Sequence, residues 1–202
     1  MKIFLVTGIS LLVLTGIVIP ILPFMLGWNP TYGTPSFEFP FENPDEIVRL
    51  RGYNLIEEGS AYDDHHRGID LEISVNGTKV ISPCTGTVGL ITTSINKNKG
   101  HIMISVNIRI NFAWSVMLVF EPYSNSTEFH ENQMSLLKVK FGQKIVEGEE
   151  VGLLLIGGEF PHIHYQVNRY FKDVCPYNYS SDEAQTIFDE IAIRTNSTIC
   201  YP

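Results

Sequence analysis

Two short segments indicate the fold and the chemistry of this chain: His66-Arg67-Gly68-Ile69-Asp70 and Pro161-His162-Ile163-His164. Alternate residues of a β-strand point to the same face, so the two histidines of the second segment present both imidazoles on one side. In the first segment, a histidine and an aspartate lie four residues apart around a glycine, a spacing that lets both approach one point from a turn. Together the segments predict a shared site.

The residue types at this site suit zinc. Zinc is bound by imidazole nitrogen and carboxylate oxygen, and a catalytic site keeps three protein ligands and leaves a fourth position for water. We expect His66, Asp70 and His164 to supply the three ligands. His162, beside the metal, would then hydrogen-bond the water or the transition-state oxyanion. A His-x-His pair alone is weak evidence for metal binding, and the other motifs of the chain strengthen it.

The ordered motifs of the chain resemble those of the lysostaphin/LytM-type zinc metallopeptidases. The matching segments run from about residue 52 to 168, more than half the chain, and comprise His66-x-Gly68-x-Asp70, residues 82–88 (SPCTGTV), residues 141–152 (FGQKIVEGEEVG) and His162-x-His164. The resemblance implies a mainly β, antiparallel, sandwich-like domain that binds zinc. It also implies hydrolysis of peptide bonds, mostly cross-links of bacterial cell walls, although some degenerate members serve only as binding or regulatory modules.

The resemblance also assigns roles to residues and reveals one departure. It implies that His66, Asp70 and His164 bind zinc and that His162 is catalytic. The further catalytic histidine that the family carries at the end of a central strand is absent from residues 114–122 (WSVMLVFEP). With a one-residue adjustment Glu121 falls there, and its carboxylate could accept a proton from zinc-bound water. Alternatively, Glu121 merely ends an edge strand before a proline.

Composition sets the domain count and excludes one class of partner. A chain of 202 residues with 44% hydrophobic content can hold one domain with a substantial core and a terminal extension. The formal net charge of -8 and the absence of a basic cluster argue against nucleic-acid binding.

The N-terminus has the length of a membrane span. Residues 3–28 carry no charge, and about 20 apolar residues are enough to cross a bilayer. A cleavable signal peptide usually has an apolar stretch of about 7–15 residues and a small-residue cleavage site, neither of which is obvious here. We therefore expect residues 1–28 to form an uncleaved signal anchor with the domain outside the cytoplasm; the alternative is secretion after cleavage. Residues 29–50 would be a linker, as a tether or as an irregular strap along the domain of residues 51–202.

The rest of the pattern is rich in strands and ends in a helix. Asn76-Gly77 is a strong type I′ hairpin signal between the first two expected strands. A possible capping box at Ser180 to Glu183 precedes apolar residues at helical intervals up to Ile191, which predicts a C-terminal helix against the sheet. The expected strands cover residues 68–75, 79–82, 87–93, 101–110, 113–121, 151–155 and 163–168.

Cysteines and asparagines fit an exported chain. Cys175 and Cys200 bracket the expected helix and are favoured as a disulfide, which leaves Cys84 as a buried thiol, while the sequence leaves the other pairings open. Four Asn-x-Ser/Thr sequences fit export from a cell that glycosylates asparagine; they start at Asn76, Asn125, Asn178 and Asn196. The remaining histidines are expected to face solvent or to support the site indirectly; they are His65, His101 and His130.

Overall fold

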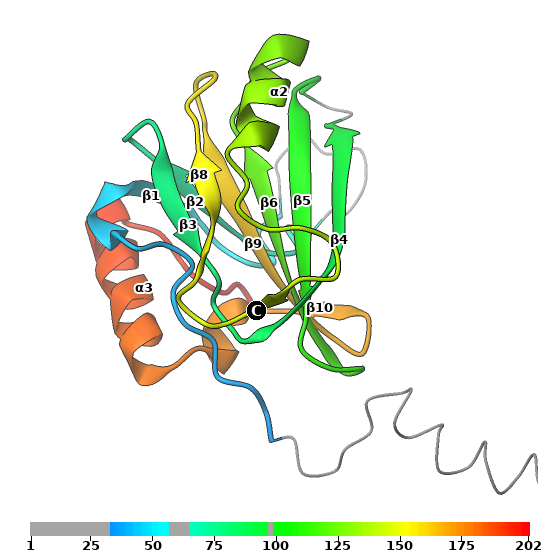
Figure 1. The fold of residues 1–202 in the computed structure, drawn as a ribbon. Helices are drawn as coiled ribbons and strands as arrows, with labels where there is room; N and C mark the ends of the chain where they lie inside the picture. Colours follow the sequence, from blue (N-terminus) through cyan, green and yellow to red (C-terminus); the bar gives the residue numbers. More distant parts are fainter. Residues whose placement is uncertain (1–32, 57–64, 97–98) are drawn as a thin grey trace, which may run out of the picture.

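The computed structural model describes residues 33–56, 65–96 and 99–202. Its main feature is an eight-stranded antiparallel sheet of order β1-β2-β9-β6-β5-β4-β7, with β10 paired to β9, and β3 and β8 form a separate two-stranded sheet (Figure 1). The strands are β1 Ile47–Arg51, β2 Ile69–Ile73, β3 Thr78–Ile81, β4 Gly86–Ile95, β5 Ile102–Arg109, β6 Trp114–Glu121, β7 Lys144–Ile145, β8 Glu150–Leu154, β9 His162–Arg169 and β10 Lys172–Val174. The helices are η1 Pro44–Glu46, α2 Thr127–Ser135, η2 Pro176–Tyr179 and α3 Asp182–Thr195.

The mainly β, antiparallel architecture is confirmed, and all seven expected strands are present within a few residues of their predicted bounds. The expected hairpin at Asn76-Gly77 is wrong. β2 pairs with β1 and β9, whereas β3 pairs with β8, so the turn joins two sheets. Only Gly77 of the pair has a positive φ (83°), while a type I′ turn needs two. The Asn76 carboxamide instead accepts the backbone N–H of Ile156 at 2.8 Å, which fixes the turn against a neighbouring segment.

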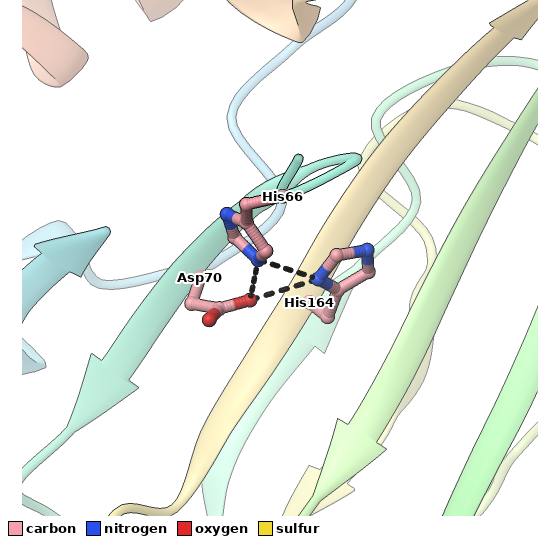
Figure 2. Close-up of side chains that lie close together, drawn as sticks. All are labelled: His66, Asp70 and His164. Carbon is pink, nitrogen blue, oxygen red and sulfur yellow. Dashed lines mark hydrogen bonds and ion pairs between the residues drawn. The ribbon is translucent and has the colours of Figure 1, made fainter. Parts of the chain in front are cut away.

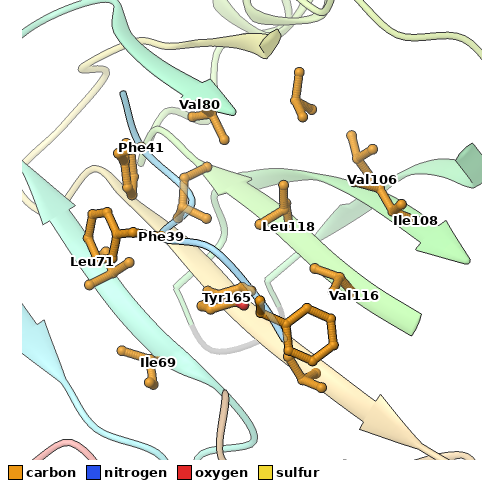
Figure 3. Packing of buried hydrophobic residues seen from close by; sticks show 14 of the residues in the cluster. Phe39, Phe41, Ile69, Leu71, Val80, Val106, Ile108, Val116, Leu118 and Tyr165 are labelled. Atoms are coloured by element: carbon orange, nitrogen blue, oxygen red, sulfur yellow. The ribbon is translucent and has the colours of Figure 1, made fainter. Parts of the chain in front are cut away.

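One hydrophobic core lies between the main sheet, the β3–β8 pair and α3. Alternate residues of β2, β6 and β9 point into this core, because successive strand side chains face opposite sides of the sheet. Figure 3 shows Leu71, Leu118 and Tyr165 from these three strands packed with Phe39 and Phe41, and all five side chains are buried. The opposite face of β9 carries His162 and His164. Because one face of the strand packs into the core, these two histidines point away from it on the other face.

The segment expected as a linker takes the form of a strap. From residue 37 onward its aromatic side chains enter the core, and Phe37, Phe39 and Phe41 are buried. The segment continues into β1, which forms an edge of the main sheet. The expected signal anchor at residues 1–28 lies outside the described residues. In the part of the chain that the structure describes, no helix has the length and apolar character needed to cross a membrane.

The expected C-terminal helix is confirmed as α3, but its N-cap differs by one residue. Ser181, and not Ser180, caps the helix by accepting the backbone N–H of Ala184 at 3.1 Å. A capping box would need Glu or Gln at the position of Ala184, so the reciprocal bond from Glu183 is not part of this cap. The buried residues of α3 are Ala184, Phe188 and Ile191, and they lie on one face at helical spacing.

The Cys175–Cys200 disulfide is present, and Cys84 is the free, buried thiol. The bridge closes a loop with a sequence separation of 25 around η2 and α3. Because loop closure restricts the unfolded chain, the Cys175→Ser/Cys200→Ser double variant should lose about 3 kcal/mol of unfolding free energy. Denaturant unfolding of the variant and the parent chain, both measured without reductant, tests this. An unchanged unfolding free energy would contradict it.

Candidate functional site

Three polar side chains meet on the outer face of the main sheet. His66 lies just before β2, Asp70 is on β2 and His164 is on β9, and β2 pairs with β9 so that Asp70 is directly opposite His164. Asp70 Oδ1 is 2.9 Å from His66 Nε2 and 2.8 Å from His164 Nδ1, and the two nitrogens are 3.1 Å apart (Figure 2). Strand pairing therefore brings together the three residues that the sequence predicted as zinc ligands.

The chemistry of these donors fits a metal cation. His66 Nδ1 donates its hydrogen to the carbonyl oxygen of Gly52 at 2.8 Å, so in the neutral ring Nε2 carries the lone pair. That lone pair faces a carboxylate oxygen, which also only accepts, and a nitrogen of the second imidazole. A backbone bond that holds one ring nitrogen and aims the other is the usual support of a zinc-bound histidine. Within the described residues, these three side chains form the one cluster of this kind that could hold a metal ion.

Charges around Asp70 favour its ionised form. Burial alone would raise the pKa of the carboxyl, but the charge of His162 and the hydrogen bonds from His164 and His66 hold that pKa well below its usual range. Burial likewise opposes charging of His66, but its contact with Asp70 raises the pKa of the imidazole. Zinc binding requires the ionised carboxylate, and it requires the imidazole of His66 to give up the proton that Asp70 stabilises.

Gly68 makes room for the ligand on β9. A Cβ at this position would lie 2.7 Å from both Nε2 of His164 and the carbonyl oxygen of Tyr165, closer than real Cβ contacts allow. We predict that Gly68→Ala displaces the His164 ring and weakens zinc affinity about 10-fold or more. Zinc titration against a competing chelator measures this. Gly89→Ala is the control, because its Cβ would approach nothing closer than 3.4 Å; equal affinity in both variants would contradict the prediction.

His162 and Glu121 lie beside the ligand cluster. They are direct partners across β9 and β6, and both are buried. The Nδ1 of His162 donates to the carbonyl oxygen of Phe160 at 2.8 Å, which turns Nε2 toward the site. This Nε2 is 3.6 Å from Asp70 Oδ1 and 3.7 Å from Glu121 Oε1. The alternative that Glu121 ends an edge strand is wrong, because β6 lies inside the sheet between β9 and β5.

The two carboxylates stabilise a proton on His162. Burial would lower the pKa of this imidazole, but Asp70 and Glu121 outweigh burial and raise the pKa to about 9. Burial also opposes ionisation of Glu121, yet the contacts with His162 and His101 lower the pKa of its carboxyl. The site thus pairs an ionised carboxylate with a cationic imidazole next to the ligand cluster.

His101 is the site residue whose role the sequence did not identify. Of the two expectations, facing solvent or supporting the site indirectly, the second holds: His101 is buried, and its Nε2 lies 2.6 Å from Glu121 Oε2. The ring stacks on Tyr123 with centroids 4.1 Å apart. Because Ile104 pairs with Phe120, His101 falls diagonally opposite Glu121 on the same face of the sheet. Correct pairing of these two strands would have revealed the contact from sequence.

Open space adjoins the ligand cluster. A cavity of about 230 Å³ is lined by all three ligands, His162 and Glu121, and also by Arg51, Asn96, Lys99 and Tyr123. A neighbouring cavity of about 440 Å³ shares Arg51, Asp70 and His162 with it and extends to Phe160 and Ile56. The two spaces share lining residues, so together they form one open region of mixed polar and apolar character beside the cluster.

Comparisons with known proteins support the fold. No protein-family model matches the sequence, and neither does any curated protein. A zinc-containing peptidase from Vibrio cholerae is 18% identical with a TM-score of 0.51, over 70% of this chain and 39% of that one. Csd3 of Helicobacter pylori is 19% identical with a TM-score of 0.50, over 80% of this chain and 41% of that one. Lysostaphin from Staphylococcus simulans is 15% identical with a TM-score of 0.43, over 78% and 55%.

This chain spans about two fifths of the length of the first two neighbours. At such identities the likeness concerns the fold. The resemblance that the motifs predicted is confirmed at this level: the chain has the fold of the lysostaphin/LytM-type peptidases.

Proposed function

We propose that this protein is a zinc-dependent metalloendopeptidase that hydrolyses peptide bonds, in cell-wall or surface peptides outside the cytoplasm. The observation that carries the proposal is the convergence of His66, Asp70 and His164 within 3.1 Å of one another, with two further proton-handling side chains beside them. A zinc-containing peptidase among the structural neighbours supports the same chemistry.

Each residue of the site has a distinct part in this proposal. Bound zinc would be held by the three ligands and would polarise the scissile carbonyl and activate water. Glu121 Oε1 accepts the proton of the attacking water, in the place of the histidine that this chain lacks. His162 Nε2 donates a hydrogen bond to the developing oxyanion. His101 is a positioning residue, because its hydrogen bond to Oε2 fixes the carboxylate with Oε1 toward His162.

We also propose that residues 1–28 anchor the domain on the outer side of a membrane. The Cys175–Cys200 bridge supports an oxidising compartment, since disulfides are rare in the cytosol. Glycosylation at the four Asn-x-Ser/Thr sequences is part of the same proposal. All four asparagines are exposed: Asn76, Asn125, Asn178 and Asn196.

Hydrolysis by the purified full chain tests the proposed function. The detergent-solubilised protein is incubated with cell-wall fragments and with a diverse peptide library, and new amino termini are identified by mass spectrometry. We expect cleavage within peptides by the parent chain and strongly reduced cleavage by His162→Ala at unchanged zinc content. A parent chain that holds zinc but cleaves neither substrate set would show that the domain is a binding module instead.

A further inference from the structure

Three aromatic side chains project from the end of the main sheet opposite the ligand cluster. We call Phe112, Tyr170 and Phe171 the aromatic tip; their side chains are 39%, 53% and 82% exposed. Tyr170 and Phe171 form the two-residue turn between β9 and β10, and Phe112 lies in the loop between β5 and β6. The rings of Phe112 and Phe171 pack edge to face with centroids 5.7 Å apart. The tip is thus one cluster from two loops.

The backbone of the turn is strained by its own side chains. Tyr170 and Phe171 both have positive φ, 50° and 65°, the region that two-residue hairpin turns need. Asn-Gly is the favoured pair there, and large side chains are sterically disfavoured. The Tyr170 N–H donates to the carbonyl oxygen of Ala113 at 2.7 Å and holds this conformation. Large rings kept exposed in a strained turn point to a role outside the folded core.

Three basic side chains border the aromatic tip. Arg109, Arg169 and Lys172 are all exposed on the strand ends next to it. Across residues 109–115 and 168–173 the one acidic side chain is Asp173, which accepts a hydrogen bond from the Tyr53 hydroxyl at 3.1 Å. This basic end stands on a chain whose formal net charge is -8. Exposed aromatic rings beside arginine and lysine suit a bilayer surface that carries anionic lipids, because the rings can enter the headgroup region and the cations attract the lipid charge.

We propose that the aromatic tip inserts into the headgroup region of an anionic membrane, an inference that rests on the membrane placement proposed above. The strap, which begins in blue in Figure 1, enters at the same end of the sheet. The ring of Phe37 lies 6.2 Å from that of Trp114, the first residue of β6. Phe37 follows Trp28, the last residue of the expected anchor, by nine positions, a reach of at most about 30 Å. The tip and the expected anchor therefore can meet the same membrane.

Contact of the aromatic tip with the membrane would fix the orientation of the active site relative to the lipid surface. β6 and β9 each have eight residues, with the tip loops at one end and Glu121 and His162 at the other. At about 3.3 Å per residue, the site would stand roughly 25 Å from the tip. The open region beside the cluster would then face away from the lipid, toward wall or surface peptides.

A tryptophan reporter tests lipid contact. The Phe171→Trp full chain is placed in vesicles of phosphatidylcholine and phosphatidylglycerol at about 3:1, with or without bromine on the upper acyl chains, and its fluorescence is compared with that of the parent chain. We expect a blue shift and quenching by bromine. Ile95→Trp, an exposed apolar position at the far end of β4, should show neither. Absence of bromine quenching at the tip would overturn the proposal. If a blue shift nevertheless occurs, the tip contacts a second copy of the chain and not lipid.

The strain supplies an independent test. Tyr170→Asn/Phe171→Gly installs the favoured turn pair, so the thermal midpoint should rise by a few degrees if the rings serve the membrane and not the fold. A lower midpoint would show that the rings stabilise the domain and would contradict the proposal. Peptide hydrolysis in detergent should be unchanged in the tip variants, which separates failure of this inference from failure of the proposed function.

Discussion

The Glu121→Gln variant is expected to hydrolyse peptides about 100-fold more slowly than the parent chain, with unchanged zinc content. Glutamine keeps the shape of the side chain and its hydrogen bond to His101, but it cannot take a proton from water. Single-turnover rates together with elemental analysis of the same samples measure both quantities. A fully active Glu121→Gln variant would show that the general base is another residue.

His101 variants separate positioning from packing. His101→Gln can keep an N–H donor toward Glu121 Oε2 and should retain most of the activity, whereas His101→Leu fills similar space without a donor and should lose rate. Both should keep zinc, because His101 does not contact the ligand cluster in the described structure. Comparison of kcat and KM for the two variants tests this. Equal rates in both would contradict a positioning role.

Zinc itself should be lost when any ligand is removed. We expect the zinc content to fall from about one per chain to near zero in each of the variants His66→Ala, Asp70→Ala and His164→Ala. Hydrolysis should then be unmeasurable, because two protein ligands bind zinc far more weakly than three. His130→Ala is the matched control, since this histidine contacts Thr93 outside the cluster. Elemental analysis after gel filtration measures the content. Stoichiometric zinc in all three variants would eliminate the assignment.

Most of the fold could be predicted because its signals are local. Alternation of apolar residues marked the strands, and helical spacing with a serine cap marked α3. The pairing of β2 with β9 follows less directly, yet the motifs predicted its consequence, the meeting of Asp70 with His164. The Asn76-Gly77 signal failed because its flanking strands bury apolar residues in two different sheets, so tertiary pairing overrides the turn preference.

The elements that escaped prediction depend on distant contacts. The strap has no periodicity, and its aromatic residues are buried because they pack against distant elements: Phe39 contacts Phe188 of α3, and Phe41 pairs with Val80 of β3. No helix was predicted for the polar stretch that forms α2, because its hydrophobic face is weak. A distant contact supports this helix: the Gln133 side chain donates to the backbone of β8 at 2.7 Å. The contact of His101 with Glu121 could be predicted only from the register between β5 and β6, which composition alone does not give.

Peptide hydrolysis by this protein is expected to depend on a metal held by His66, Asp70 and His164. The most direct measurement of this dependence is reconstitution: the purified full chain is stripped with a chelator, dialysed, and titrated with zinc while hydrolysis of a cleaved peptide is followed. We expect activity to disappear on stripping and to return in proportion to added zinc up to about one equivalent per chain. Hydrolysis that persists in the stripped, zinc-free protein would contradict it.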